Sequence, residues 1–390
     1  MPTALAGRDQ QREDFAALLQ RLNLGYSEKS MILTGLRGVG KTVLLNDFAQ
    51  TAVEAKWRVI ELEIPRAGDD LWFRRQIAIG ARRALLSMSA PERRREKLKA
   101  ALAVLRNFSV SIDPEGKITA GFGVEAVHGL GDSHDLGHDL TDLFVTLGQA
   151  AQEEQTGVVF LIDEIQFLST GQLEALVMAL HKAVQKRLPV TLVGAGLPQV
   201  AKLSGDAKSY SERLFQFPII GALNPKDAAI AITEPALKEK VIFTDQAVKK
   251  CIEVTSGYPY FIQEIGYAIW RTAAGTSIKD VDVDNALIDY TARLDESFFR
   301  VRLDRSSLLE RSYMRAMAEL GPDPHSAGDV AKLLGRNTNQ AATIRKGLIE
   351  KGLLYSTPDY GFAQFTVPQF DQYMKRIMPS LTVPPVRGTK

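Results

Sequence analysis

The sequence has 390 residues, of which 45% are hydrophobic and 24% are charged. This composition is ordinary for a globular protein with a sizeable core, and the length predicts two or three domains. The formal net charge of +2 excludes a chain that binds nucleic acid through its overall charge, so any basic surface must be local. The single cysteine, Cys251, excludes an internal disulfide and favours a reducing compartment.

The N-terminus lacks the basic start and the long apolar stretch of a signal peptide. The longest apolar run, at 188–198, is interrupted by glycine and proline and falls short of the roughly 18 apolar residues of a membrane helix. We therefore expect a cytoplasmic protein with no membrane partner.

The first predicted elements form a strand–helix–strand unit. An amphipathic helix is predicted over 14–22, behind the short motif Gly7–Arg8–Asp9. An apolar strand over 31–34, a helix over 41–54 and a second strand over 58–64 follow. This order predicts an α/β fold with a parallel sheet.

The loop between that strand and helix reads GLRGVGKT and fits the phosphate-binding pattern G-x-x-x-x-G-K-[ST]. Its glycines let backbone N–H groups approach phosphate oxygens at the positive end of a helix. Lys41 is expected to reach the β- and γ-phosphates, and Thr42 to place its hydroxyl on Mg²⁺. We predict that the chain binds ATP and Mg²⁺. The expected nucleotide contacts in this loop are Gly35, Arg37, Gly38, Val39, Gly40, Lys41, Thr42 and Val43.

An insertion is predicted at about 107–139, after a helical segment over 71–106. The basic run within that segment, at 93–99, favours a solvated helix face over a phosphate contact. The insertion is predicted to hold a β-hairpin over 107–122 and a loop over 128–139. The loop carries His128, His134 and His138 beside acidic residues, but their spacing matches no particular metal site, so a plain loop is favoured.

A uniformly apolar strand over 158–162 ends in Asp163 and Glu164. Acidic residues at the carboxyl end of a buried parallel strand lie beside the phosphate loop, because ligands bind at that edge of the sheet. Asp163 is expected to hold Mg²⁺, and Glu164 to accept the proton of the attacking water. A catalytic glutamate also disfavours a kinase that acts on a small molecule.

The remaining pattern predicts the rest of the sheet and then helices. A helix over 170–186, a strand over 190–193 and an edge strand over 215–220 complete the sheet. Later helices are predicted over 225–240, 244–256, 259–274 and 281–295.

The region beyond residue 306 predicts a winged helix-turn-helix. Helices over 306–320, 327–334 and 338–351 are followed by a hairpin of strands over 353–356 and 362–367. The predicted core residues of the two shorter helices are Val330, Leu333, Leu334, Ile344, Leu348 and Ile349. The proline-rich end at 379–390 is expected to be a disordered tail.

Five segments carry a family resemblance: Gly7–Arg8, GLRGVGKT, VVFLIDEIQ, VGAGLP at 193–198 and SGYPYFIQ at 256–263. Together they resemble the AAA+-related branch that contains archaeal-type ATPases and STAND NTPases, which is similar in layout to origin-recognition ATPases. The resemblance covers about residues 5–300 and implies a P-loop sheet with an extra strand between the two phosphate-site strands. It also implies a helical lid, with the nucleotide buried between sheet and lid.

This resemblance divides the chain into an ATPase core at 1–221, a lid at 222–300, a winged helix at 301–378 and a tail at 379–390. It adds Gly7, Arg8 and Pro259 to the expected nucleotide contacts, since residues 257–259 match the G-x-P element of STAND lids. A helix that starts at Pro259 after a glycine stop explains the same residues locally.

Two departures from the family pattern favour slow turnover. Gly194–Gly196 stand where many AAA+ proteins place a polar residue that orients water, and the lid has no clear sensor arginine. An arginine supplied by a second copy is the alternative, with Arg213 as first candidate and Arg187 as second.

Two functions remain open. The first is a Mg·ATP-dependent switch that acts on double-stranded DNA through the winged helix, where Arg336, Arg345 and Lys346 are the expected contacts. Residues 306–390 carry 11 basic against 7 acidic residues, and the wing carries Asp359 but no basic residue, so this charge excess is modest. The alternative is a nucleotide-gated scaffold, which assembles with copies of itself or with a protein partner and does not bind DNA.

Overall fold

The computed structural model describes residues 5–88, 95–110, 131, 133, 135–200, 211–357, 359 and 361–385. Most of the expected hairpin at 107–122 lies outside these residues, as do His128 and His134. No helix among the described residues is both long enough and apolar enough to cross a membrane.

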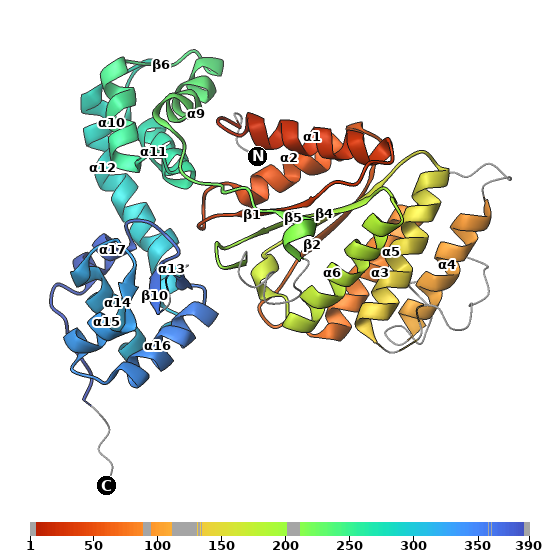
Figure 1. The fold of residues 1–390 in the computed structure, drawn as a ribbon. Coiled ribbons are helices and arrows are strands. Elements are labelled where there is room, and N and C mark those ends of the chain that lie inside the picture. Colours follow the sequence, from red (N-terminus) through yellow and green to blue (C-terminus); the bar gives the residue numbers. More distant parts are fainter. Residues whose placement is uncertain are drawn as a thin grey trace, which may run out of the picture.

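The N-terminal half is built on a five-stranded parallel sheet in the order β2-β3-β4-β1-β5 (Figure 1). The strands span β1 (Ser30–Thr34), β2 (Arg58–Glu63), β3 (Val158–Asp163), β4 (Val190–Gly196) and β5 (Phe215–Gln216). Strand β4 lies between β1 and β3, which confirms the expected extra strand. All strands run parallel, so the predicted phosphate loop and the Asp163–Glu164 pair come to the same edge.

Alternating side chains of the sheet feed two separate cores. On one face, Met31 and Leu33 pack with α1 (Asp9–Asn23) and α2 (Lys41–Glu54), where Phe15 and Phe48 stack with ring centroids 4.3 Å apart. On the other face, Ile32 packs with the second helical layer. That layer consists of α3 (Asp70–Leu86), α4 (Arg95–Val110), α5 (Leu136–Glu153) and α6 (Thr170–Gln185).

The expected insertion is shorter than predicted on both sides. Residues 107–110 continue α4 and do not begin a hairpin, because Phe108 is fully buried on the apolar face of that helix. The expected loop at 128–139 gives way to α5 at Leu136, where Asp135 caps the helix by accepting from the backbone N–H of His138. Among the described residues no group of histidines, cysteines and carboxylates could hold a metal ion.

A short helix, α8 (Ser211–Leu214), leads into β5, and four helices then form a separate layer beside the sheet (Figure 1). They are α9 (Pro225–Lys238), α10 (Asp245–Thr255), α11 (Pro259–Thr272) and α12 (Asp280–Arg293). A two-stranded parallel pair, β6 (Ile242–Phe243) and β7 (Ser277–Ile278), ties the layer together. We call α9–α12 the lid.

The C-terminal region, residues 294–385, begins with a π-helical turn (Leu294–Phe299) and α13 (Arg300–Leu303), which the sequence did not predict. It continues with α14 (Leu308–Leu320), α15 (Ala327–Leu334), α16 (Thr338–Glu350) and α17 (Phe370–Ile377). Its antiparallel sheet has the order β8-β10-β9, from β8 (His325–Ser326), β9 (Leu354–Ser356) and β10 (Phe362–Phe365).

Two expectations for this region are wrong. Leu333, expected in the core, is 39% exposed. Residues 379–385, expected in a disordered tail, lie against α14 and the turn after α15. There the Ser312 hydroxyl donates to the Thr382 carbonyl at 2.7 Å, and Leu381 and Val383 pack on the core.

Candidate active site

The loop between β1 and α2 has the backbone shape that a phosphate loop needs. Gly38 and Gly40 adopt positive φ angles of 86° and 94°, which side-chain-bearing residues rarely adopt. Gly40 precedes the first residue of α2, so free N–H groups of the helix N-terminus face the loop. Gly35 has no room for a side chain, because a Cβ there would lie 2.1 Å from the carbonyl oxygen of Ile220.

Lys41 points into this loop and donates to the carbonyls of Gly35 and Leu36 at 2.9 and 2.8 Å. Burial lowers the pKa of Lys41 to about 8, although the nearby carboxylates of Glu164 and Asp163 act in the opposite direction. A partly buried ammonium of this kind is stabilised by a further negative charge, as a phosphate would supply.

Thr42 and Asp163 come from different elements and meet at the sheet edge. The Thr42 hydroxyl donates to Asp163 Oδ2 at 2.5 Å, across 121 positions of sequence. A hydroxyl and a carboxylate are the hard oxygen ligands that Mg²⁺ prefers beside phosphates. The pair therefore fits the metal that the sequence predicted at this position.

Glu164 has an unusual backbone conformation, with φ at +52°, directly after β3. Left-handed backbone at a residue other than glycine is uncommon and is often found at functional sites. Its carboxylate lies 3.7 Å from Arg37 Nη2 and also accepts a hydrogen bond from the Gln166 amide.

Gln166, from the turn after β3, links Glu164 to the backbone that follows β4. Its Oε1 accepts from the Leu197 N–H at 3.1 Å, while its amide donates to Glu164. A Cβ at Gly196 would lie 2.7 Å from this oxygen, so a larger residue in β4 would displace Gln166. The departure at Gly194–Gly196 thus makes room for a polar residue from the turn after β3.

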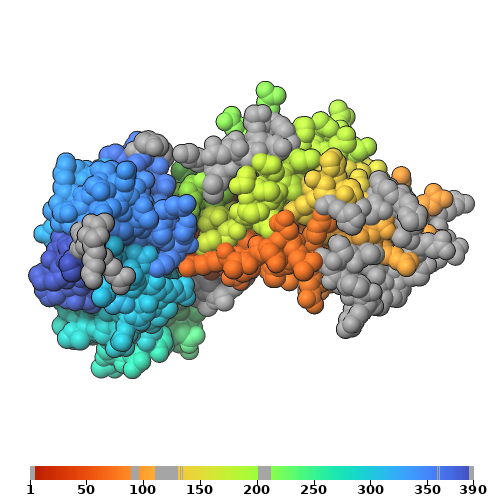
Figure 2. Space-filling view, turned by 90° about the horizontal axis from the view of Figure 1, so that it is seen from below, coloured from red at the N-terminus to blue at the C-terminus, as the bar shows by residue number. Residues whose placement is uncertain are grey.

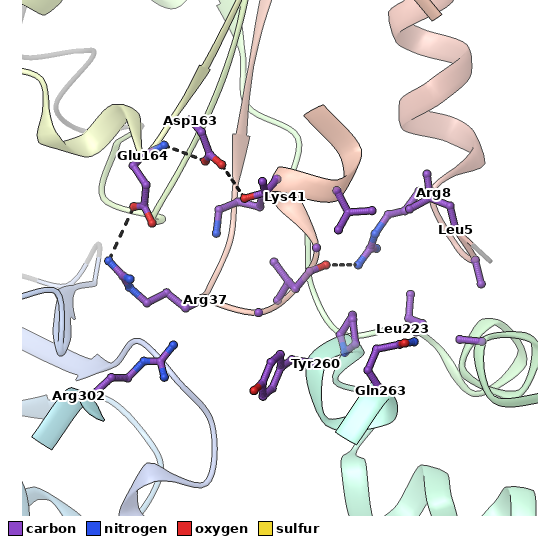
Figure 3. Close-up of a pocket in the computed structure, with 18 residues that line it drawn as sticks. Leu5, Arg8, Arg37, Lys41, Asp163, Glu164, Leu223, Tyr260, Gln263 and Arg302 are labelled. Carbon is purple, nitrogen blue, oxygen red and sulfur yellow. Dashed lines mark hydrogen bonds and ion pairs between the residues drawn. The ribbon is translucent and has the colours of Figure 1, made fainter. Parts of the chain in front are cut away.

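Lys41, Thr42, Asp163 and Glu164 line a cavity of about 630 Å³, which is within the usual range for a ligand of nucleotide size (Figure 3). Figure 3 shows Arg37 directed toward Glu164, and Arg8 on the opposite side of the loop. Arg8 is buried and donates to the carbonyls of Val39 and Gly221 at 3.1 and 2.7 Å, so it supports the loop backbone. Gly7 lies outside the cavity, where a Cβ would be 2.7 Å from Asp227 of the lid.

The lid closes the cavity through the start of α11. Pro259 is the first residue of α11 and lines the cavity. The backbone N–H of Tyr260 donates to the Gly38 carbonyl at 3.1 Å, and the Tyr258 hydroxyl donates to the Arg37 carbonyl. Two carbonyls of the phosphate loop are therefore bonded to the lid.

Residues 4–193 match the family described as AAA ATPase domain. This part of the chain is similar to an AAA ATPase domain, and we refer to it by that name. Its five-stranded parallel sheet with flanking helices matches a P-loop AAA+ fold, and the family match supports a nucleotide-dependent ATPase. A domain of unknown function (DUF8462) matches residues 296–374. No curated protein matches the sequence.

Solved structures share the arrangement at low sequence identity. A Walker-type ATPase of Pyrococcus abyssi is 16% identical, with a TM-score of 0.52 over 93% of this chain and 95% of its own, which shows a common fold. The RuvB Holliday junction branch migration motor of Thermotoga maritima is 16% identical and covers 96% and 97%, with a TM-score of 0.46. The ORC1 protein of Aeropyrum pernix, solved in complex with DNA, is also 16% identical, with a TM-score of 0.46. This match covers 96% of the present chain and 94% of the ORC1 chain. We draw no conclusion from the last two, because their TM-scores are low.

Arg302 lines the cavity of the AAA ATPase domain and was not predicted. It comes from α13, beyond the lid, where its guanidinium stacks 3.9 Å above the Phe298 ring and donates to the Phe298 carbonyl. Burial and the charge of Arg37 lower the pKa of Arg302 to about 10. No sequence motif marks Arg302, because its position depends on how the C-terminal region docks. The other lining residues that sequence reasoning missed are Leu5, Ala6, Leu223, Ala231, Tyr260 and Gln263.

Arg213 is an exposed residue of α8 and does not line the cavity of its own chain. Its role in a neighbouring copy stays a prediction. Two of the expected DNA contacts are engaged within the chain, since Arg336 donates to the Pro384 carbonyl at 2.8 Å and Arg345 donates to the Gly361 carbonyl. Arg345 therefore does not point freely outward, whereas the Lys346 side chain is 80% exposed.

Proposed function

We propose that the chain binds and hydrolyses Mg·ATP in this cavity. Lys41 and the loop N–H groups would hold the phosphates, and Thr42 and Asp163 would hold Mg²⁺, which neutralises phosphate charge when bound. Glu164 would take the proton of the attacking water. Its contacts with Arg37 and Gln166 support slow turnover, because the carboxylate must leave these partners before it can reach the attacking water.

We further propose that nucleotide binding controls the C-terminal region. The observation that carries this proposal is a direct bond between the two: the Arg37 N–H of the phosphate loop donates to the Thr366 carbonyl, which follows β10, at 3.1 Å. The carbonyl of Arg37 accepts a hydrogen bond from the Tyr258 hydroxyl of the lid. A movement of the phosphate loop thus reaches the lid and the C-terminal region through one residue.

We infer that the C-terminal region is a winged helix, because α14–α16 are followed by a hairpin of β9 and β10 that also pairs with β8. DNA is the partner we favour for it. The start of α16 exposes Asn339 and Gln340, and Lys346 lies two turns further along, a set that suits base edges and a phosphate. The alternative is a scaffold that binds a protein partner, and the internal bonds of Arg336 and Arg345 favour it.

Backbone hydrogen exchange tests the switch. We expect Mg·ATP and Mg·ADP to give different exchange rates at 362–370, a segment that does not line the nucleotide cavity. The difference should vanish in Lys41→Ala, which should also lose ATP hydrolysis, and persist in Lys249→Ala, which removes an exposed charge of α10. Equal exchange at 362–370 in all nucleotide states would contradict the coupling, even if ATP is hydrolysed.

A further inference from the structure

A second, smaller cavity of about 160 Å³ adjoins the nucleotide cavity and is lined mainly by cations. It lies between the phosphate loop, the segment after β2, α13 and the start of β9. Figure 2 shows this junction, where the C-terminal region (blue) meets the orange segment of the AAA ATPase domain. We call it the arginine pocket, after Arg37, Arg66, Arg302 and Arg305. Lys351 also lines it, and no carboxylate among the described residues does.

The positive charge of the arginine pocket is largely uncompensated. Lys351 is neutralised by Glu310 at 2.6 Å, and Arg37 has a single carboxylate nearby, Glu164. Within the described part of the chain, no carboxylate forms a salt bridge with the other three arginines. Burial and repulsion from Arg37 and Arg305 lower the pKa of Arg66, although the Glu164 carboxylate acts in the opposite direction. The guanidinium groups that line one pocket repel each other, and an anion bound there would offset this repulsion.

Several donors in the arginine pocket also lack an acceptor. The Nε and Nη2 atoms of Arg37 and the Nε of Arg302 are buried without a hydrogen-bond partner among the described residues. Gly352 leaves space beside them, since a Cβ there would lie 3.0 Å from Arg37 Nη2 and 3.4 Å from Arg66 Nη2. Buried donors without acceptors are unfavourable, and an oxyanion would satisfy them.

We propose that the arginine pocket binds a phosphate dianion. Guanidinium groups match tetrahedral oxyanions because each presents two parallel N–H donors. The phosphate could be free inorganic phosphate or the terminal phosphate of a nucleotide in the adjoining cavity. The pocket takes Arg37 and Arg66 from the AAA ATPase domain and Arg302 and Arg305 from the C-terminal region, so its occupant would hold the two together.

The test compares two double variants of the full-length chain. Arg66→Gln with Arg305→Gln removes two charges of the pocket that do not line the nucleotide cavity. Arg75→Gln with Arg83→Gln removes two exposed charges of α3 as a matched control. Calorimetric titration measures the affinity for inorganic phosphate of protein that is saturated with Mg·ADP. A titration with chloride at equal ionic strength is the reference. Separate titrations measure the affinity for a non-hydrolysable ATP analogue and the affinity for ADP.

We expect the pocket variant to lose about tenfold or more in affinity for phosphate or for the analogue, and to keep its ADP affinity. The control should match the wild type in each titration. A loss for inorganic phosphate identifies the free ion as the ligand, and a loss for the analogue alone identifies the nucleotide. Unchanged affinity for both in the pocket variant would overturn the proposal. If that variant also loses ADP binding, Arg66→Lys with Arg305→Lys, which keeps both charges, replaces it and should show a smaller loss.

Discussion

The Lys41 ammonium is partly buried and donates to two carbonyls of its own loop. Its pKa of about 8 lies below the ordinary value of 10.5, because burial disfavours the charged form. The unfolded chain therefore binds more protons than the folded chain between pH 8 and 10.5, and Lys41 makes the free energy of unfolding rise with pH over that window. Phosphate groups beside the ammonium would raise the pKa of Lys41 again, because they favour its charged form.

The affinity for Mg·ADP should consequently fall as pH rises above about 8, by up to about tenfold per pH unit. The reason is that binding then requires Lys41 to take up a proton. Calorimetry in buffers of different ionisation enthalpy measures that uptake directly. In Lys41→Met the affinity should be lower and nearly independent of pH, and a wild-type affinity that is flat from pH 7.5 to 9.5 would refute the assignment.

Glu164→Gln should retain Mg·ATP and lose hydrolysis by roughly 10²- to 10⁴-fold, because the amide keeps the shape of the side chain but cannot accept the proton. Single-turnover hydrolysis and nucleotide affinity are the two measurements. Glu253→Gln, an exposed change in α10, is the control and should behave as the wild type. Wild-type turnover in Glu164→Gln would show that another group is the base.

The lid depends on one tight connection between its helices. Gly257 joins α10 to α11 with a φ of +68°, and its carbonyl accepts from the Leu223 N–H at 2.8 Å. A Cβ at this position would lie 2.3 Å from the Leu223 carbonyl oxygen, which is backbone and cannot turn aside. The next helix, α11, holds Tyr260 on the phosphate loop, so the turn fixes how the lid meets the nucleotide cavity.

Gly257→Ala should therefore destabilise the chain by about 1–3 kcal/mol and weaken ATP binding, because it combines backbone strain with a steric clash. Thermal unfolding and ATP titration measure the two effects. Gly266→Ala is the matched control, since Gly266 lies within α11 with no atom near the added Cβ, and it should be neutral or slightly stabilising. Equal stability of the two variants would argue against the strained turn.

The whole molecule places its C-terminal region against the phosphate loop and leaves one face of α16 exposed. Contacts that cross this boundary include the Arg37–Thr366 bond and the arginine pocket. A DNA-binding function would use the exposed face, where the Lys346 side chain is 80% exposed and its partner is Glu350, 4.0 Å away on the same helix. The other two basic residues that the sequence indicated donate to backbone carbonyls.

If α16 binds DNA, Lys346→Ala should reduce the salt slope of log K by about one and leave ATP affinity unchanged, because it removes one phosphate contact. Lys332→Ala is the control, with an equally exposed side chain on α15. Arg345→Ala is unsuitable, since it would also release the Gly361 carbonyl. Absence of salt-sensitive DNA affinity in the wild type, with and without ATP, would leave the scaffold as the better function.

Elements whose chemistry is local were predictable from the sequence alone. The helix at 41–54 and the helix at 327–334 have the predicted bounds, because an apolar period and a glycine at one end are encoded within each segment. The phosphate loop was likewise predictable, since its glycines and lysine are consecutive. Asp163 was predicted to follow a buried parallel strand at the sheet edge that also holds the phosphate loop. Its contact with Thr42 therefore agrees with the parallel order of the sheet.

The distant residues that join the site depend on tertiary contacts and could not be predicted from the sequence. Gln166 reaches Glu164 because Gly196, on a neighbouring strand, leaves space, and Arg302 enters the cavity because the C-terminal region docks on the phosphate loop. Residues 379–385 read as disordered from their prolines, yet backbone carbonyls there accept bonds from α14 and the turn after α15. Such contacts depend on docking geometry, which leaves no periodic or consecutive trace in the sequence.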